Sequence, residues 1–241
     1  MLRELTEARN LFRMNPVPDH RLASAVRALR RVSTILRTSV VHWQVVETLT
    51  TRDFLAFRDR LTPASGFQSA QIREVEILLG LPDDERIALG REGSYLDALR
   101  DETGGPSPAQ ARVMRRLADT PSLREVLEEW LYRTPIDGSL FGSEGDAANV
   151  DRFLTRFLDA HRKEAEGRLG QVGVQAMVPA DVERLRERFD AEVERARAFL
   201  FAEDEPEATR LRQRRIRAAL VFIESYRDLP LLAWPREVVD T

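Results

Sequence analysis

Two phenylalanines and an arginine stand close together in this sequence at helical spacing. Phe54, Phe57 and Arg58 occupy positions i, i+3 and i+4, so in a helix Phe54 and Arg58 share one face, one turn apart. A guanidinium beside aromatic rings can bind a carboxylate through two parallel hydrogen bonds while the rings contact a planar apolar body. The spacing therefore indicates a site for an apolar ligand with a carboxylate. The alternative is a pair of core aromatics beside a surface ion pair of Arg58 with Asp59 or Glu47.

A turn of small residues follows this stretch. Ala64, Ser65 and Gly66 come directly after Pro63, and small side chains let another group approach the backbone closely. Generic catalytic signatures are absent, because the sequence has no Walker A loop, no dinucleotide-binding glycine pattern, no HExxH and no GxSxG. The lack of cysteine excludes disulfides, thiolate metal sites and cysteine nucleophiles. The three histidines, His20, His42 and His161, are far apart and are interpreted as surface or partly packed residues rather than metal ligands.

Helices must position these residues. Over residues 21–47 apolar side chains recur every three, four or seven positions, which predicts one helix of about 28 residues that carries Trp43. The sequence Thr50-Thr51-Arg52-Asp53 has the form of a capping box and predicts a helix over 53–60. The turn at 63–66 ends that helix, and another is predicted from Ser65 or Gly66 to Leu79.

The rest of the chain also has helical periodicity. Helices are predicted over 108–118, 121–132, 150–168, 179–201 and 208–226, with Thr120 as the N-cap of the second. Residues 134–145 are predicted to form a loop. No β-branched run alternates between turn signals, so no strand is expected. The sequence therefore predicts a single all-α domain over residues 1–241, and the loop at 134–145 is the one alternative boundary.

The bulk composition is that of a globular protein. Hydrophobic residues make up 43% and charged residues 32% of the 241 residues, enough to bury a sizeable core. The formal net charge of -3 gives no global field for nucleic acid or acidic lipid, so neither partner is predicted. No apolar run reaches the roughly 18 residues of a membrane span. The N-terminal sequence MLRELTEARN has no signal-peptide apolar stretch, so we expect a cytoplasmic protein.

The central stretch resembles a known family. D-F-x-x-F-R followed by P-A-S-G-F-Q-S resembles the signature of the tryptophan 2,3-dioxygenase family. RRVSTILRTSVVHWQVVETLT is similar to the long central helix of that family, and SGFQSAQIREVEILLG to the helix after the signature. LRELTEARNLF, PSLREVLEEWL and RLRQRRIRAALVFIESYRDLPLLAWP are similar to further family segments. The resemblance thus covers nearly the whole chain.

The resemblance implies a fold, a reaction and a set of site residues. Arg58 would bind the carboxylate of L-tryptophan and Phe54 would pack on the indole, while Trp43, Ser65 and Gly66 would line the haem edge and its distal face. The family inserts both atoms of O₂ across the indole double bond, giving N-formylkynurenine in the kynurenine pathway. Haem iron does the oxygen chemistry and the protein supplies orientation. The family is an all-α helical bundle with long central helices, and a homotetramer in which a neighbouring subunit helps close each site.

Two family segments are not found in this sequence. Family members carry a distal histidine in an H-Q-x-x-E-L-W-F-K pattern, and a proximal haem histidine followed by G-T-G-G-S-S-G. Neither pattern is present, so the chain is interpreted as truncated at both ends, and we predict that it does not hold haem through an axial histidine. We also expect Trp43, Phe54, Phe57 and Phe67 to lie partly on an exposed apolar surface.

Three explanations of this incompleteness stay open. The sequence is a fragment, or another chain supplies the rest of the site, or the protein is a degenerate homologue without haem. The alternative function is therefore a non-catalytic helical binding or scaffold protein that keeps the family core.

Overall fold

The fold is helical. The computed structural model describes residues 1–14, 16–61, 69–86, 94–101, 103–174, 179–226, 235 and 238–240. These residues contain no β-strand, only an isolated bridge between Ile136 and Ser139 in the predicted loop, so the all-α prediction is confirmed. In the same ranges, no helix combines the length and apolar character that a membrane crossing requires. The chain divides into two compact units, one formed by Met1–Leu127 with residues 238–240 and one by 128–236; the single-domain prediction stays a prediction.

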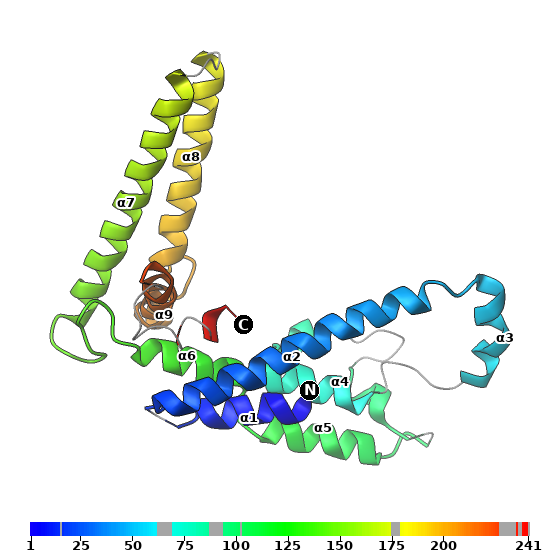
Figure 1. The fold of residues 1–241 in the computed structure, drawn as a ribbon. Coiled ribbons are helices and arrows are strands. Elements are labelled where there is room, and N and C mark those ends of the chain that lie inside the picture. The colour runs from blue at the N-terminus through cyan, green and yellow to red at the C-terminus, as the bar shows by residue number, and fades with distance from the viewer. Residues whose placement is uncertain are drawn as a thin grey trace. The chain divides into compact units, whose positions relative to one another are not determined.

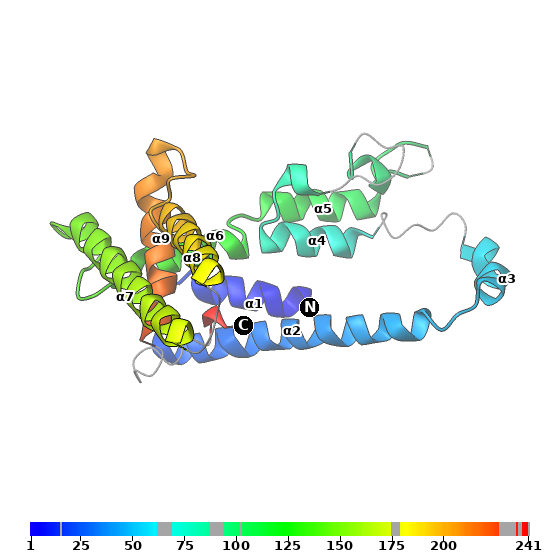
Figure 2. The same cartoon turned by 90° about the horizontal axis from the view of Figure 1, so that it is seen from above.

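The first unit is built on a long helix. Helix α2 (Asp19–Val46) has 28 residues and confirms the predicted element. Helix α1 (Leu2–Phe12), which the sequence interpretation did not identify as a helix, packs along the N-terminal part of α2 in both views (Figures 1 and 2). Leu5 and Ala8 of α1 and Leu22 and Val26 of α2 are buried there. The C-terminal part of α2 continues past α1 toward α3 (Thr51–Leu61).

A second helix pair completes this unit. Helices α4 (Ala70–Leu79) and α5 (Pro108–Ala118) pack on each other, and α4 also packs on α1. Short 3₁₀ turns, η2 (Asp83–Glu85) and η3 (Asp97–Leu99), lie between them in sequence. Helix α5 has the predicted bounds, because the Ser107 hydroxyl caps it by accepting a hydrogen bond from the backbone N–H of Gln110 at 3.0 Å.

Helix α6 (Leu123–Arg133) corrects one prediction. The N-cap is Ser122, not Thr120. The Ser122 hydroxyl accepts from the backbone N–H of Glu125 at 3.3 Å, and the Glu125 carboxylate accepts from the backbone N–H of Ser122 at 2.7 Å. This reciprocal capping box satisfies two backbone donors, whereas a cap at Thr120 would put Leu123, which has no side-chain acceptor, in the position of the glutamate. The helix therefore begins two residues later than predicted.

The second unit contains the end of α6 from Glu128, followed by α7 (Asp146–Val174), α8 (Pro179–Leu200) and α9 (Glu207–Ser225). Helices α7 and α8 run side by side as an antiparallel hairpin with α9 at its base (Figure 1). Helix α7 is longer than the predicted 150–168. The predicted apolar face of α7 forms much of the core, which contains Leu131, Ile136, Val150, Phe153, Leu154, Leu158, Leu200, Ile216, Ala218, Ala219 and Ile223.

Candidate functional site

The C-terminal part of α2 is exposed in the described part of the chain. Helix α1, with 11 residues, covers only about 16 Å of a helix that is about 42 Å long. All residues from 34 to 60 are exposed, and we call this segment the exposed arm. Its large apolar side chains, each 37–66% exposed, are Ile35, Leu36, Val40, Val41, Trp43, Val45, Val46, Leu49, Phe54, Leu55 and Phe57. The apolar stripe predicted over residues 21–47 is thus buried near its N-terminal end and exposed over the rest of its length.

Helix α3 begins at Thr51, directly after the capping box and two residues before the predicted start at Asp53. The Thr50 hydroxyl donates to the Asp53 carboxylate at 2.7 Å and accepts from the backbone N–H of Asp53 at 3.2 Å. The backbone N–H of Thr50 donates to the same carboxylate at 3.3 Å. Because these bonds are local, α3 keeps its start although none of its residues up to Arg60 is buried.

Two aromatic rings and a free guanidinium lie on α3. The rings of Phe54 and Phe57 meet edge to face, with centroids 5.6 Å apart and an interplanar angle of 82°. Arg58 follows one turn after Phe54. Among the residues that the structure describes, Arg58 makes no hydrogen bond or ion pair, so neither Asp59 nor Glu47 neutralises it. Its donors are available to an external carboxylate.

Of the other predicted site residues, only Trp43 lies in the described part of the chain. The Trp43 side chain is 64% exposed on α2, and its ring contacts no aromatic ring in the described part of the chain. Ser65 and Gly66, and with them Phe67, lie outside the described residues. The structure thus shows the aromatic and cationic part of the predicted site as an open surface rather than a closed pocket.

The three histidines are dispersed. His20 and His42 are exposed on α2. His161 on α7 is exposed too, but its ring is flanked by Phe157 at 6.2 Å and Phe189 at 6.3 Å between centroids. No cluster of three metal-binding side chains occurs in the described ranges.

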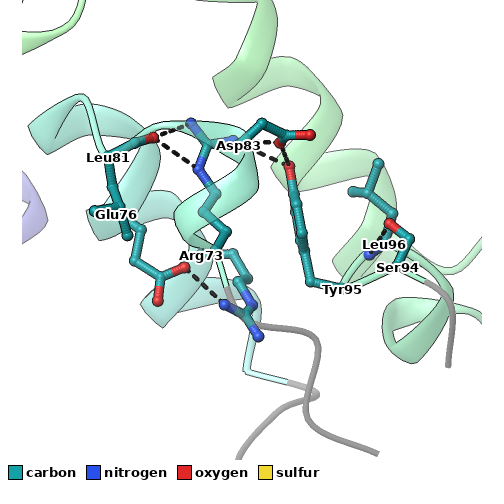
Figure 3. A network of polar contacts seen from close by, with 8 residues as sticks. Arg73, Glu76, Leu81, Asp83, Ser94, Tyr95 and Leu96 are labelled. Atoms are coloured by element: carbon teal, nitrogen blue, oxygen red, sulfur yellow. Dashed lines mark hydrogen bonds and ion pairs between the residues drawn. The ribbon is translucent and has the colours of Figure 1, made fainter. Parts of the chain in front are cut away.

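One polar network was not predicted from the sequence. The Tyr95 hydroxyl donates to Asp83 at 2.8 Å and accepts from Arg86 at 3.0 Å, while the Arg73 guanidinium lies 5.2 Å from the Tyr95 ring centroid and pairs with Glu76 (Figure 3). Burial raises the pKa of the Tyr95 phenol, and the bond to Asp83 raises it further. These residues hold the segment around Tyr95 against the end of α4. No local pattern connects positions so far apart in sequence.

The side chains of the exposed arm are suited to binding a ligand. Phenylalanine rings and a tryptophan offer apolar contact area, and an unpaired guanidinium offers two parallel donors to a carboxylate. No hydrogen bond joins a histidine to a carboxylate within the arm, and the Ser39 hydroxyl donates to the carbonyl of Ile35 at 2.9 Å rather than to a base. The arrangement is therefore suited to holding an aromatic carboxylate and an apolar planar group.

Comparison with known proteins gives one consistent result. The family model described as Tryptophan 2,3-dioxygenase matches residues 1–238. A tryptophan 2,3-dioxygenase of Sorangium cellulosum is 58% identical over 243 residues, which cover 100% of this chain and 58% of that protein. Tryptophan 2,3-dioxygenase 2 of Ralstonia nicotianae is 49% identical over 244 residues, which cover 100% of this chain and 65% of that protein.

A third similar protein covers less of the chain. A tryptophan 2,3-dioxygenase-like protein of Xanthomonas campestris pv. campestris is 49% identical over 196 residues, which are 80% of this chain and 70% of that protein. The chain spans less than two thirds of the length of the Sorangium and Ralstonia proteins. Roughly a third or more of each of those proteins therefore has no counterpart here.

Proposed function

The chain belongs to the tryptophan 2,3-dioxygenase family, and we propose that it takes part in the haem-dependent oxidation of L-tryptophan by O₂ to N-formylkynurenine. Both oxygen atoms add to the two carbons of the indole double bond, which breaks, so the reaction needs no further co-substrate. The observation that carries the proposal is Arg58, which has no partner among the described residues, on the same short helix as Phe54 and Phe57. The activity is proposed for the assembled protein in which this chain works, since its relatives are longer.

Arg58 is the proposed carboxylate site. Its guanidinium can donate two parallel hydrogen bonds to the carboxylate of L-tryptophan. Phe54, one turn earlier on α3, is the proposed contact for the indole. A substrate held at both points has its ring fixed in orientation. Orientation of this kind lowers the entropic part of the barrier before any oxygen chemistry begins.

Haem fits the described residues only in part. Its apolar planar body suits the exposed arm, where Trp43 and the two phenylalanines offer ring surface. Its iron needs an axial ligand, and no described histidine suits that role. His42 is next to Trp43 but is turned by about 100° from it on the helix, and His161 stands between two rings on α7. We therefore propose that protein beyond the described residues supplies the iron ligand.

A prediction about haem follows directly. We expect that adding haemin to the purified chain gives no tight one-to-one complex, and that the Soret absorbance of any mixture is the same in wild type and His42→Ala. A stoichiometric complex whose Soret band disappears in His42→Ala would contradict this prediction.

We also propose that the exposed arm is covered by further protein in the working assembly, as in a homo-oligomer. Eleven large apolar side chains between residues 35 and 57 face solvent. Monomeric proteins rarely leave apolar patches larger than a few hundred Å² uncovered. A cytoplasmic location stays a prediction from the sequence.

The test is activity in the assembled protein. The chain is purified from its own host under conditions that keep associated chains, haem content is read from the Soret band, and N-formylkynurenine formation from L-tryptophan is followed under air. We expect haem-dependent product formation that Arg58→Gln abolishes or strongly reduces. A haem-free preparation that forms no product even with added haemin would overturn the proposal and favour the scaffold alternative.

A further inference from the structure

A pocket lies in the second unit. It has a volume of about 240 Å³, is open to solvent on one side, and is lined by the end of α6, the start of α7, the middle of α9 and the loop before α7. Its apolar walls include Tyr132, Phe141, Val150 and Leu211. The rings of Tyr132 and Phe141 are in contact, with centroids 4.6 Å apart. A cavity of about 150 Å³ lined by apolar side chains is large enough for benzene, so this pocket has room for one ring and a short chain.

Two ion pairs form the polar wall of the pocket. Arg215, whose side chain is 4% exposed, donates to Asp146 at 2.6 Å and to the backbone carbonyls of Tyr132 at 2.7 Å and Thr134 at 3.1 Å. Each of its three nitrogens therefore has a partner. Asp146 also accepts from the Ser139 hydroxyl at 2.6 Å. This ion pair is largely buried. It joins the C-terminal end of α6 and the N-terminal end of α7 to α9.

Arg214 differs from Arg215 in one respect. Its Nη1 donates to both carboxylate oxygens of Asp151, at 2.9 and 3.1 Å, and its Nε donates to the carbonyl of Phe201 at 3.2 Å. The guanidinium also lies 5.3 Å from the Phe201 ring centroid. Within the described part of the chain, its Nη2 donates no hydrogen bond. Arg214 thus contacts Asp151, the carbonyl of Phe201 and the Phe201 ring, while its Nη2 has no hydrogen-bond partner among the described residues.

We propose that this pocket binds a small aromatic monocarboxylate, with the ring against Tyr132, Phe141 and Val150 and the carboxylate on Nη2 of Arg214. A carboxylate adds a charge-assisted hydrogen bond without breaking an existing one. Asp146 and Asp151 are already paired with Arg215 and Arg214, whereas Nη2 of Arg214 makes no hydrogen bond within the described residues. The pocket therefore offers a carboxylate a charged donor, and a cationic ligand should bind more weakly.

The test uses Leu211, which stands at the pocket and is 62% exposed. Substitution of so exposed a side chain does not disturb the core, and Leu211→Lys and Leu211→Glu place opposite charges at one position. The ¹³C-methyl NMR signals of Val150 and Ala147 are followed in the full-length chain during titration with 3-phenylpropionate, and separately with 3-phenylpropylamine. For a ligand of this size we expect a roughly millimolar Kd for the carboxylate.

The expected results separate the proposal from a general apolar effect. Leu211→Lys should tighten binding of 3-phenylpropionate and Leu211→Glu should weaken it, each about two- to fivefold, as for exposed charge pairs. Three results would overturn the proposal: equal NMR shifts with 3-phenylpropylamine, no NMR shift with 3-phenylpropionate, or the same change of Kd in both Leu211 variants. Arg58→Gln should leave these titrations unchanged, so this test and the test of the tryptophan site fail or succeed separately.

Discussion

Arg58 offers the most direct test of the proposed tryptophan site. The perturbation is Arg58→Ala, with Arg58→Lys to separate the loss of charge from the loss of the planar guanidinium. Arg58 has no partner among the described residues, and it is exposed on α3. Removing it therefore breaks no internal ion pair. We expect the stability of the fold to be unchanged, so that any effect is on the ligand.

The magnitude follows from the hydrogen bonds that are lost. A bidentate charge-assisted contact to a carboxylate contributes about 1.5–3 kcal/mol once a pocket is closed around it. At about 1.4 kcal/mol per decade, Arg58→Ala should lower kcat/KM for L-tryptophan roughly 10- to 150-fold. Lysine is a point charge without the fork of arginine, so Arg58→Lys should recover only part of this loss.

The assay compares L-tryptophan with tryptamine, which lacks the carboxylate, in the assembled haem protein. The matched control is Arg60→Ala, because Arg60 is an exposed arginine of the same helix but stands two positions, about 200°, further round. Wild type and Arg60→Ala should prefer L-tryptophan, whereas both Arg58 variants should lose much of that preference. If the Arg58 variants kept the full preference, or if Arg60→Ala lost it equally, the assignment of the carboxylate site would be refuted.

Three further predictions concern association and stability. Val40→Glu, on the exposed arm at 63% exposure, should reduce self-association in light scattering, and a wild-type chain that is monomeric at tens of micromolar would contradict this. The hydrogen bond from Arg9 lowers the pKa of Asp119 in the folded protein. The stabilisation by this carboxylate is therefore complete above the pKa of about 3.9 that it has in the unfolded chain, and it is lost as the pH falls through the lower pKa of the folded state. Asp119→Asn should therefore flatten the acid side of the stability–pH curve in urea titrations, and an unchanged curve would count against the contact. Gly80→Ala should lower the free energy of unfolding by about 1–3 kcal/mol, because φ is +90° and the new Cβ would stand 2.7 Å from a neighbouring atom. Gly104→Ala, where φ is +79° and no atom lies within 4 Å of the new Cβ, measures the backbone strain alone. Equal losses of stability in the two variants would show that the close contact at Gly80 costs nothing.

Much of the fold could be predicted because its signals are local. A capping box needs only four consecutive residues, so the start of α3 near Thr50 was predicted within two residues. Ser107 and Pro108 similarly set the start of α5. The periodicity of α2 predicted a helix of the observed length. The same local spacing placed Phe54 and Arg58 one turn apart, and it could do so because a helix fixes neighbours three and four positions away whatever surrounds it.

The tertiary structure decided what covers each of these faces. The stripe on α2 has one period along its length, yet Leu22 and Val26 are buried and Val40 and Trp43 are exposed, because α1 packs on only the first part. The sequence also left open whether Arg58 pairs with an acidic neighbour, and in the structure it has no such partner among the described residues.

The pocket in the second unit came from the tertiary structure alone. Arg215 is joined to Asp146, 69 positions earlier, and Arg214 to Asp151, 63 positions earlier. Periodicity and capping act over a few residues, so a sequence read locally gives no sign that these charges meet. Local interactions thus determined the helices of this protein, whereas packing between distant segments determined which side chains are buried, paired or left free to bind.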